Sequence, residues 1–484
     1  MALTLAACGG DDDDPVVTSS DDSADDTTPT AQTFTLTTDS DTREDFTGGA
    51  GDDTFSAPTT NSVQTLTSGD DIDGGDGEDT LFANLTTATV TPAGIANIET
   101  YQFNASGNAA STVDLTNAAG YEKIENLQSG QNLTVSNIAA IPASGVAVTS
   151  AAGTTTFQFT DAALAGDSDA LSIVLDGVGA NAINIGSESD GDGDIETFNI
   201  TATGGDSDLG NNNISDGDVT AVNVDSTAAL DFGDTPLFGS VDTFDASDNS
   251  GGVSVDIADR AAASSDARTF TGGTGADNFD VTALTIANVG DLTVSTGGGD
   301  DTVATDDALD ESIAAFDGGA GTDTLALVEA IAGGDATYSN FERLAFDVSD
   351  VGGTLTQDID VIDGSIATHT VSGDGGIADD ITLQNVADSS TVQVLNDFVG
   401  TLTVAQAAAG TNSLTVDFSE VTGAVTVEEI EADDGRLTEL TLINDSGSAV
   451  TATLRTHKFA CGIEVGVIHA PKQRGQDERA LLAD

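Results

Sequence analysis

A glycine-rich motif that ends in an aspartate and an apolar residue recurs along the chain. Its pattern is Gly-Gly-x-Gly-x-Asp-x-apolar, and it occurs at 48–55, 74–81, 272–279 and 318–325. A fifth segment, 296–303, lacks only the first glycine. Glycine permits the positive φ angles of tight turns, and an apolar residue after the aspartate suits the start of a buried strand. The motifs therefore predict repeated turns that each lead into a strand.

Between the motifs, short segments alternate apolar residues with Thr, Asn, Ser or Asp. Examples are "LSIVLDG" at 171–177 and "TFNITAT" at 197–203. Alternation with a period of two, bounded by turn residues, indicates strands; helical periodicity is rare, and its best short candidates are 306–316 and 404–410. The interval between successive motif aspartates near residue 300 has room for two or three strands plus turns. We therefore expect an all-β fold, a parallel β-helix or β-solenoid with one motif at a corner of each rung.

The chain is strongly acidic, with 83 Asp and Glu against 11 Lys and Arg and a net charge of -72. Nucleic acids and anionic membrane surfaces both need a basic face, so neither is an expected partner. Three explanations of the acidity remain: disorder, a high-salt surface, or binding of divalent cations. Disorder throughout is disfavoured, because 38% of the residues are hydrophobic.

The spacing of the motif suits calcium, a hard cation that takes six to eight oxygen ligands. Glycines let the backbone aim carbonyl oxygens inward, and the aspartate adds a carboxylate. We therefore predict Ca²⁺ as the cofactor, the alternative being tight β-turns without a bound ion. Asp70 joins the set because it precedes Asp79 in nine-residue register. The predicted metal-site residues are Gly48, Gly49, Gly51, Asp53, Asp70, Gly74, Gly75, Gly77, Asp79, Gly272, Gly273, Gly275, Asp277, Gly298, Asp301, Gly318, Gly319, Gly321 and Asp323.

These motifs resemble the RTX, or hemolysin-type, calcium-binding repeats of bacterial secreted proteins. That resemblance implies turns stacked with calcium between them, although here the motifs are isolated where the family has tandem runs. Residues 239–327 also resemble the repeating region of surface-layer proteins of Gram-negative bacteria. The resemblance implies an extracellular, calcium-binding structural protein of the bacterial cell surface, of the surface-layer or matrix type. Its expected partners are further copies of itself or a cell-surface polysaccharide.

The N-terminal sequence Leu-Ala-Ala-Cys at 5–8 resembles the lipobox of bacterial lipoproteins. The resemblance implies lipidation at Cys8 and anchoring to the outer membrane, the only membrane contact that we expect. The C-terminal tail has an unlike composition, typical of a frameshifted or truncated segment, and we assign no function to it. The expected segments are 1–8 remnant lipoprotein signal, 9–32 acidic disordered tether, 33–105 N-terminal RTX-like β segment, 106–238 β-solenoid, 239–330 RTX-like calcium-binding β-solenoid, 331–454 C-terminal β-solenoid, and 455–484 atypical tail.

The sequence offers little for catalysis, and we expect a protein that is not an enzyme. It contains neither the His-Glu-x-x-His zinc motif nor the Gly-x-Ser-x-Gly nucleophile motif. His369 lies in an alternating segment, where a surface position on a strand is the favoured interpretation. Two alternative functions stay open: a calcium-dependent adhesin, and a β-solenoid polysaccharide lyase or hydrolase.

Other acidic residues allow two interpretations each. Glu99, Glu125 and Glu342 stand between apolar residues with similar spacing, as ligands at the end of a rung or as solvent-facing side chains. The solvent-facing interpretation is favoured because Glu is usually exposed. The alternating acids in 190–194 are similar to the start of an EF-hand loop, yet the loop's later glycine and glutamate are absent, which favours a solvated turn.

Overall fold

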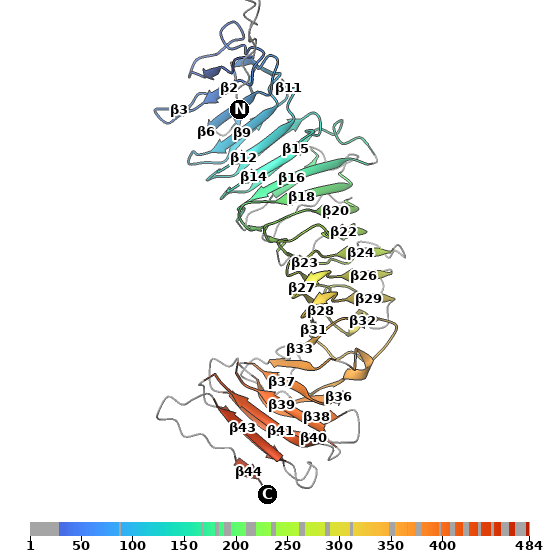
Figure 1. The fold of residues 1–484 in the computed structure, drawn as a ribbon. Helices are drawn as coiled ribbons and strands as arrows, with labels where there is room; N and C mark the ends of the chain where they lie inside the picture. The colour runs from blue at the N-terminus through green and yellow to red at the C-terminus, as the bar shows by residue number, and fades with distance from the viewer. Residues whose placement is uncertain are drawn as a thin grey trace, which may run out of the picture.

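In the computed structural model the strands stack one above another along an elongated column (Figure 1). The N-terminal strands lie at one end of the column and the C-terminal strands at the other. The structure describes residues 29–483 apart from short gaps, so Cys8 and Cys461 lie outside the described residues. The gaps are 87–88, 167, 180–182, 188–194, 210–218, 234–238, 261–266, 286–290, 310–312, 348–353, 365, 373–379, 396–397, 407–411, 420–424, 434–436, 447–449, 456–463 and 470–480.

Two long sheets carry most of the strands. The longer sheet contains β1 (Thr33–Thr35), β2 (Thr54–Ala57), β6 (Thr80–Leu85), β9 (Thr100–Ala105), β12 (Lys123–Leu127), β14 (Val146–Thr149), β16 (Ala170–Asp176), β18 (Thr197–Ala202), β20 (Ala221–Val224), β22 (Thr243–Asp245), β24 (Arg268–Thr271), β26 (Leu292–Ser295), β29 (Ala314–Asp317) and β32 (Thr337–Ser339). The other contains β19 (Ser207–Asp208), β21 (Leu230–Asp231), β23 (Val253–Asp256), β25 (Asn278–Asp280), β28 (Thr302–Thr305), β31 (Thr324–Leu327), β33 (Arg343–Asp347), β35 (Thr368–Ser372), β37 (Ser390–Val394), β39 (Asn412–Asp417), β41 (Leu437–Asn444) and β43 (Glu464–His469).

Five smaller sheets complete the rungs. A six-stranded sheet takes the C-terminal part of the column: β34 (Thr354–Asp358), β36 (Asp380–Val386), β38 (Val399–Gln406), β40 (Val425–Asp433), β42 (Val450–Arg455) and β44 (Leu481–Ala483). A five-stranded sheet lies near the N-terminus: β7 (Thr89–Val90), β10 (Ser111–Asp114), β13 (Leu133–Ile138), β15 (Thr155–Phe159) and β17 (Ile183–Ser187). The three short ones are β5 (Asp71–Asp73), β8 (Gly94–Ala96) and β11 (Ala118–Ala119); β27 (Gly298–Gly299) and β30 (Ala320–Gly321); and β3 (Thr59–Thr60) and β4 (Val63–Gln64).

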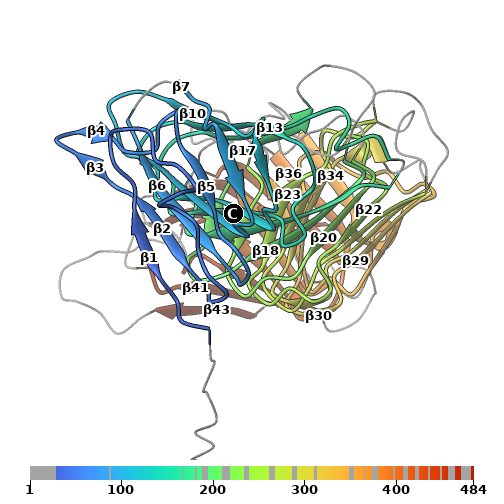
Figure 2. The ribbon, with the colours of Figure 1, turned by 90° about the horizontal axis from the view of Figure 1, so that it is seen from above.

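Strands of successive rungs are parallel, mostly in continuous register with a few bulges, which confirms the predicted all-β, parallel β-solenoid. The hairpin of β3 and β4 is the one antiparallel pair among the described strands, and it projects from the side of the column (Figure 2). Successive rungs advance by 22 to 26 residues at the motif aspartates. No helix in the described part of the chain is long and apolar enough to cross a membrane.

The core is a stack of inward-facing side chains that repeat from rung to rung. Phe244, Phe270, Val294, Phe316 and Tyr338 are register partners on adjacent strands of the longer sheet. The Phe244 and Phe270 rings stack with centroids 6.1 Å apart. Because strand side chains alternate, every second residue of most strands enters this column, which explains why aliphatic and Phe residues suffice to build it.

The expectation of a helix at 306–316 is wrong. Its described residues form a short 3-10 turn, η1 (Asp307–Leu309), followed by strand β29. The second such turn is η2 (Ile359–Val361). Strand β29 pairs with β26 and β32, so the stacked sheet overrides the weak helical preference of its alanines. In the predicted tail, β43 and β44 extend the sheets of β41 and β42.

Candidate metal centre

The motifs gather at two corners of the coil, which we call the first and second corner stacks. The first comprises 48–53, 74–79 and 97–99, and each motif leads into the longer sheet at β2 or β6. The second comprises 272–277, 296–301, 318–323 and 340–342. Its motifs leave the longer sheet and lead into the other long sheet at β25, β28 and β31. The predicted stacking of successive motifs is therefore present, along two separate edges.

In the second corner stack a ladder of hydrogen bonds links the aspartates of successive rungs. The backbone N–H of Asp277 donates to Oδ1 of Asp301 at 2.7 Å, and that of Asp301 donates to Oδ1 of Asp323 at 2.9 Å. Oδ1 of Asp277 in turn accepts from the backbone N–H of Val253 at 2.7 Å. All three aspartates are at most 2% exposed. Their carboxylates therefore point into the column.

The first corner stack contains the same ladder with two motif aspartates, where the second has three. Oδ1 of Asp53 accepts from the backbone N–H of Gln32, and the N–H of Asp53 donates to Oδ1 of Asp79, both at 2.6 Å. Both aspartates are 1% exposed. Phe55 and Leu81, two residues after the aspartates, are fully buried and pair in register. The apolar position of the motif therefore anchors each turn in the core, as predicted.

The second carboxylate oxygen distinguishes two classes of aspartate. Oδ2 of Asp53 and of Asp277, the first of each stack, accepts from the N–H of the second glycine of its own motif. Oδ2 of Asp79, Asp301 and Asp323 is buried and accepts no hydrogen bond from any described residue. A buried oxygen without a partner costs free energy, roughly 1–3 kcal/mol for a neutral group and more for a charged one. These three oxygens therefore need a cation or a proton.

The backbone conformation of the second glycine follows the same division. Gly75 and Gly319, which precede Asp79 and Asp323, have φ angles of 101° and 83°. At such angles a residue with a side chain is strained, so glycine is required. In the later motifs of each stack, the N–H of this glycine therefore does not donate a hydrogen bond to Oδ2 of the motif's own aspartate.

The first glycine of a motif packs closely against oxygen atoms, with no room for a side chain. A Cβ added to Gly272 would stand 2.3 Å from the carbonyl oxygen of Thr296 and 2.4 Å from Oδ2 of Asp277. The same convergence of a carbonyl oxygen from the next rung with the motif's own Oδ2 occurs at Gly48 and Gly74. Carbonyl and carboxylate oxygens brought together in this way are the ligands that calcium prefers, so the residues present fit a calcium ion.

Burial and mutual repulsion raise the pKa values of aspartates in both stacks. Desolvation, with a contribution from the neighbouring Asp301, raises the pKa of Asp277 to about 6. Desolvation, followed by the charges of Asp301 and Glu342, raises the pKa of Asp323 to about 6. Burial also raises the pKa of Asp79 and of Asp301. The corners therefore favour neutralisation of the carboxylates.

Each ladder ends on a glutamate. Oε2 of Glu99 accepts from the backbone N–H of Asp79 at 2.7 Å, and Oε2 of Glu342 accepts from that of Asp323 at 2.9 Å. Glu125 is 6% exposed and accepts hydrogen bonds from side chains on its own and adjacent strands. The solvent-facing interpretation is therefore wrong for buried Glu125, and it misses the role of Glu99 and Glu342 as the last acceptors of the ladders.

Asp70 lies in a different corner from Asp79, and both of its oxygens are occupied. Oδ1 accepts from the N–H of Asp41 and the hydroxyl of Thr67, and Oδ2 accepts from the N–H of Thr67. Asp70 therefore lacks the unpartnered oxygen that distinguishes Asp79.

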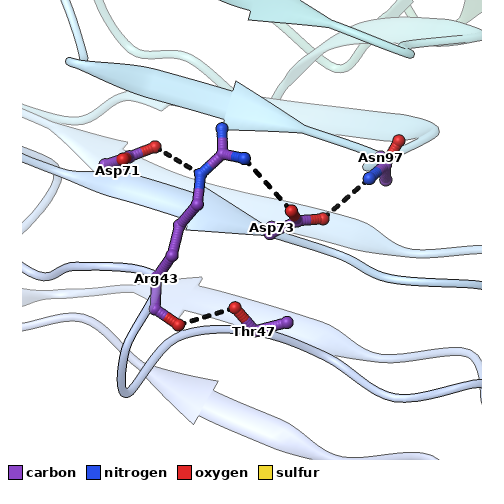
Figure 3. A network of polar contacts seen from close by, with 5 residues as sticks. All are labelled: Arg43, Thr47, Asp71, Asp73 and Asn97. Carbon is purple, nitrogen blue, oxygen red and sulfur yellow. Dashed lines mark hydrogen bonds and ion pairs between the residues drawn. The ribbon is translucent and has the colours of Figure 1, made fainter.

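An arginine neutralises the exposed acids beside that corner (Figure 3). Arg43 Nε lies 2.6 Å from Oδ1 of Asp71, and its Nη1 lies 3.2 Å from Oδ2 of Asp73. Asp73 also accepts from the side-chain amide of Asn97 at 2.8 Å. Among the described residues, by contrast, none of the ion pairs involves a motif aspartate.

His369 is not the surface residue that its pattern indicates. Its side chain is fully buried, between Leu344 and Val392 on the adjacent strands. Neither ring nitrogen has a hydrogen-bond partner among the described residues, and burial lowers the pKa to about 4. The acids at 190–194 lie outside the described residues.

Side chains alone do not make a metal site here. The described residues contain no group of three or more His, Cys, Asp and Glu side chains that could hold an ion. Any ion at the corners would therefore depend on backbone carbonyl oxygens beside one or two carboxylates. Comparison with known proteins adds no identity, since no family model matches the chain and no curated protein matches it.

Proposed function

We propose that the protein is an extracellular calcium-binding structural protein of the bacterial cell surface, in which Ca²⁺ stabilises the two corner stacks. The observation that carries the proposal is the buried Oδ2 of Asp79, Asp301 and Asp323, which no described hydrogen-bond donor reaches. A divalent cation would supply the missing partner and remove the repulsion between stacked acids. The ion would have a structural role, since it would join one rung to the next.

The residues that would hold calcium come from successive rungs. In the second corner stack they are the carboxylates of Asp301 and Asp323 with carbonyl oxygens of the glycine turns around them. In the first they are Asp53 and Asp79 with the carbonyl of Gly74, which lies beside Oδ2 of Asp53. Because one ion would contact two rungs, binding and folding of the corners would be coupled.

The remaining features of the chain suit a surface coat. A long column of repeated rungs presents a large side surface for self-association, and a net charge of -72 disfavours close packing without counter-ions. Calcium would then favour both the rung stacking within one molecule and the approach of neighbouring molecules. The proposed partner is accordingly a second copy of the chain, or an acidic polysaccharide of the surface bridged by the same ion.

A calcium titration of the chelator-stripped protein tests this function. We expect millimolar Ca²⁺ to raise the thermal midpoint measured by circular dichroism and to increase light scattering as copies associate. Mg²⁺ is the matched control, because it keeps its waters and demands octahedral geometry, so it should substitute poorly. An unchanged midpoint and unchanged scattering across millimolar calcium would falsify the proposal, whereas a raised midpoint without association favours a calcium-dependent adhesin.

A further inference from the structure

Both corner stacks end on the same short sequence, Asn-x-Glu, at 97–99 and 340–342. In each, the asparagine has a positive φ angle, 49° for Asn97 and 56° for Asn340. Each asparagine also donates its side-chain amide to an aspartate one rung earlier, at 2.8 Å in the first stack and 2.7 Å in the second. Two segments that are far apart in the sequence thus share the same backbone conformation and the same side-chain hydrogen bond.

In the first corner stack this end rung completes a set of oxygens. A Cβ added to Gly74 would stand 1.7 Å from the carbonyl oxygen of Asn97 and 2.4 Å from Oδ2 of Asp79. That Oδ2 belongs to a side chain that is 1% exposed, and it has no hydrogen-bond partner. The carboxylate of Glu99 accepts a hydrogen bond from the backbone N–H of the same aspartate. The Asn97 carbonyl and the Asp79 carboxylate therefore meet at Gly74, and the Glu99 carboxylate lies against the backbone of the same aspartate.

The second corner stack repeats the close approach of the end-rung carbonyl to the first glycine of the motif, with Cβ of the aspartate as the side-chain atom beside it. The carbonyl oxygen of Asn340 lies 2.3 Å from the Cβ position of Gly318, which is itself 2.8 Å from Cβ of Asp323. Oδ2 of Asp323 is buried without a partner, and Glu342 accepts the Asp323 N–H. The charge of each glutamate contributes to raising the pKa of its aspartate, so the two carboxylates repel each other.

We propose that each corner stack ends in a distinct divalent-cation site, formed by Asp79, Glu99 and the Asn97 carbonyl in one case and by Asp323, Glu342 and the Asn340 carbonyl in the other. This inference rests on the proposed function and adds ligands from outside the glycine motif to the last aspartate of each stack. The ligand class is a hard cation such as Ca²⁺, because every donor is oxygen. Since Glu99 is half-buried and Glu342 is exposed, these sites reach solvent and exchange their ions faster than those between two motif aspartates.

The chain offers a matched control for the glutamates. Oε2 of Glu196 accepts the backbone N–H of Asp169 at 2.5 Å, which is the same contact. Oδ2 of Asp169, however, already accepts from the N–H of Gly166 at 3.1 Å, and no glycine motif surrounds it. Glu196 therefore reproduces the hydrogen bond of the end rung without the unpartnered oxygen.

The test is calcium binding by isothermal titration calorimetry to the full chain and to Glu99→Gln, Glu342→Gln and Glu196→Gln. Glutamine keeps an oxygen for the backbone N–H and removes only the charge. We expect Glu99→Gln and Glu342→Gln each to weaken one class of sites roughly tenfold, while Glu196→Gln binds like the unmodified chain. Unchanged binding in the first two variants, or an equal loss in all three, would overturn the end sites. Absence of calcium binding by the unmodified chain would instead overturn the proposed function.

Release kinetics provide a second measurement that does not depend on the folding of a variant. When the calcium-loaded, unmodified chain is mixed with a fluorescent chelator, we expect a fast phase from the two end sites and a slower phase from the inner ones. A single phase of release would contradict solvent-reaching end sites, even if a glutamine variant failed to fold.

Discussion

The backbone N–H of Asp301 donates to Oδ1 of Asp323, which lies one rung further along the column. A side chain thus replaces a backbone carbonyl as the acceptor in the ladder. The hydrogen bond occupies one carboxylate oxygen and holds the other inside the corner, where Asp323 is fully buried. The same contact that aligns the rungs therefore leaves a buried carboxylate oxygen without a hydrogen-bond partner among the described residues.

The first prediction concerns the charge of Asp301. Asp301→Asn keeps an oxygen for the Asp277 N–H and places an amide among the corner carbonyls. We expect unfolding by urea without calcium to need about 1 kcal/mol more free energy, because a buried charge has been removed. The additional stability conferred by calcium should shrink. Asp70→Asn is the control, since both Asp70 oxygens are already bonded, and an equal loss in the two variants would count against the corner sites.

The second prediction concerns the close packing at Gly74. Gly74→Ala places a Cβ 1.7 Å from the backbone oxygen of Asn97, which cannot move without displacing its strand. We expect a loss of about 3 kcal/mol of unfolding free energy, with or without calcium. Gly130→Ala is the matched change, because its Cβ would meet nothing within 4 Å. Similar stability of the two variants in urea unfolding would contradict the close packing of the corner.

The third prediction concerns pH in the metal-free protein. The folded-state pKa of Asp277 and Asp323 is raised to about 6 from an ordinary value of 3.8. The folded state thus holds these protons more tightly, so the stability that they contribute is full below about pH 4 and is lost as pH rises through 6. Calcium competes with the same protons, so its apparent affinity should fall by roughly tenfold per pH unit and per displaced proton below pH 6.

Two measurements check that pH dependence. Urea unfolding of the stripped His369→Leu protein, which lacks the opposing contribution of the buried histidine, should show a larger stabilisation by Asp277 and Asp323 at pH 4.5 than at pH 7.5. Calorimetric titrations at pH 5.5 and 7.5 should show the weaker calcium binding at the lower pH. Calcium affinity that stays constant across this range would rule out Asp277 and Asp323 as ligands.

The fourth prediction concerns His369, whose pKa is lowered to about 4. The unfolded chain takes up a proton near pH 6.5 and the folded chain does not, so stability falls as pH drops from 6.5 towards 4. The loss is at most about 3 kcal/mol. His369→Leu, placed between apolar neighbours, should remove this part of the pH dependence when unfolding of both proteins is compared at pH 7 and 4.5. Parallel curves for the two proteins would refute the assignment.

The fold could be predicted largely from its pattern, because a period of two and a recurring glycine corner are local properties of the sequence. Phe279 and Leu325 show this well: each follows a motif aspartate by two positions and is fully buried. The segment 306–316 could not be assigned in the same way. Its alanines favour a helix locally, and only the pairing of β29 with its neighbours imposes a strand.

The candidate site was predicted in part. The glycines and aspartates of the motif carry a sequence signature, so Asp277, Asp301 and Asp323 could be expected to stack. For Glu342 the sequence left open a position at the end of a rung but favoured a solvent-facing side chain, because its place in the ladder depends on a register between rungs that differ in length. The Asn-x-Glu sequence at 340–342, which repeats at 97–99, is the local signal that was available.

The in-register parallel stacking gives the column a mechanical character. Tension between its two ends would load the hydrogen bonds along their own direction, so rungs would detach one at a time from an end. Each rung of about 24 residues would release roughly 80 Å of extended chain. The two corner stacks, if they bind ions, would resist this detachment more strongly than the other rungs. The column would then unfold in segments, each at a different force.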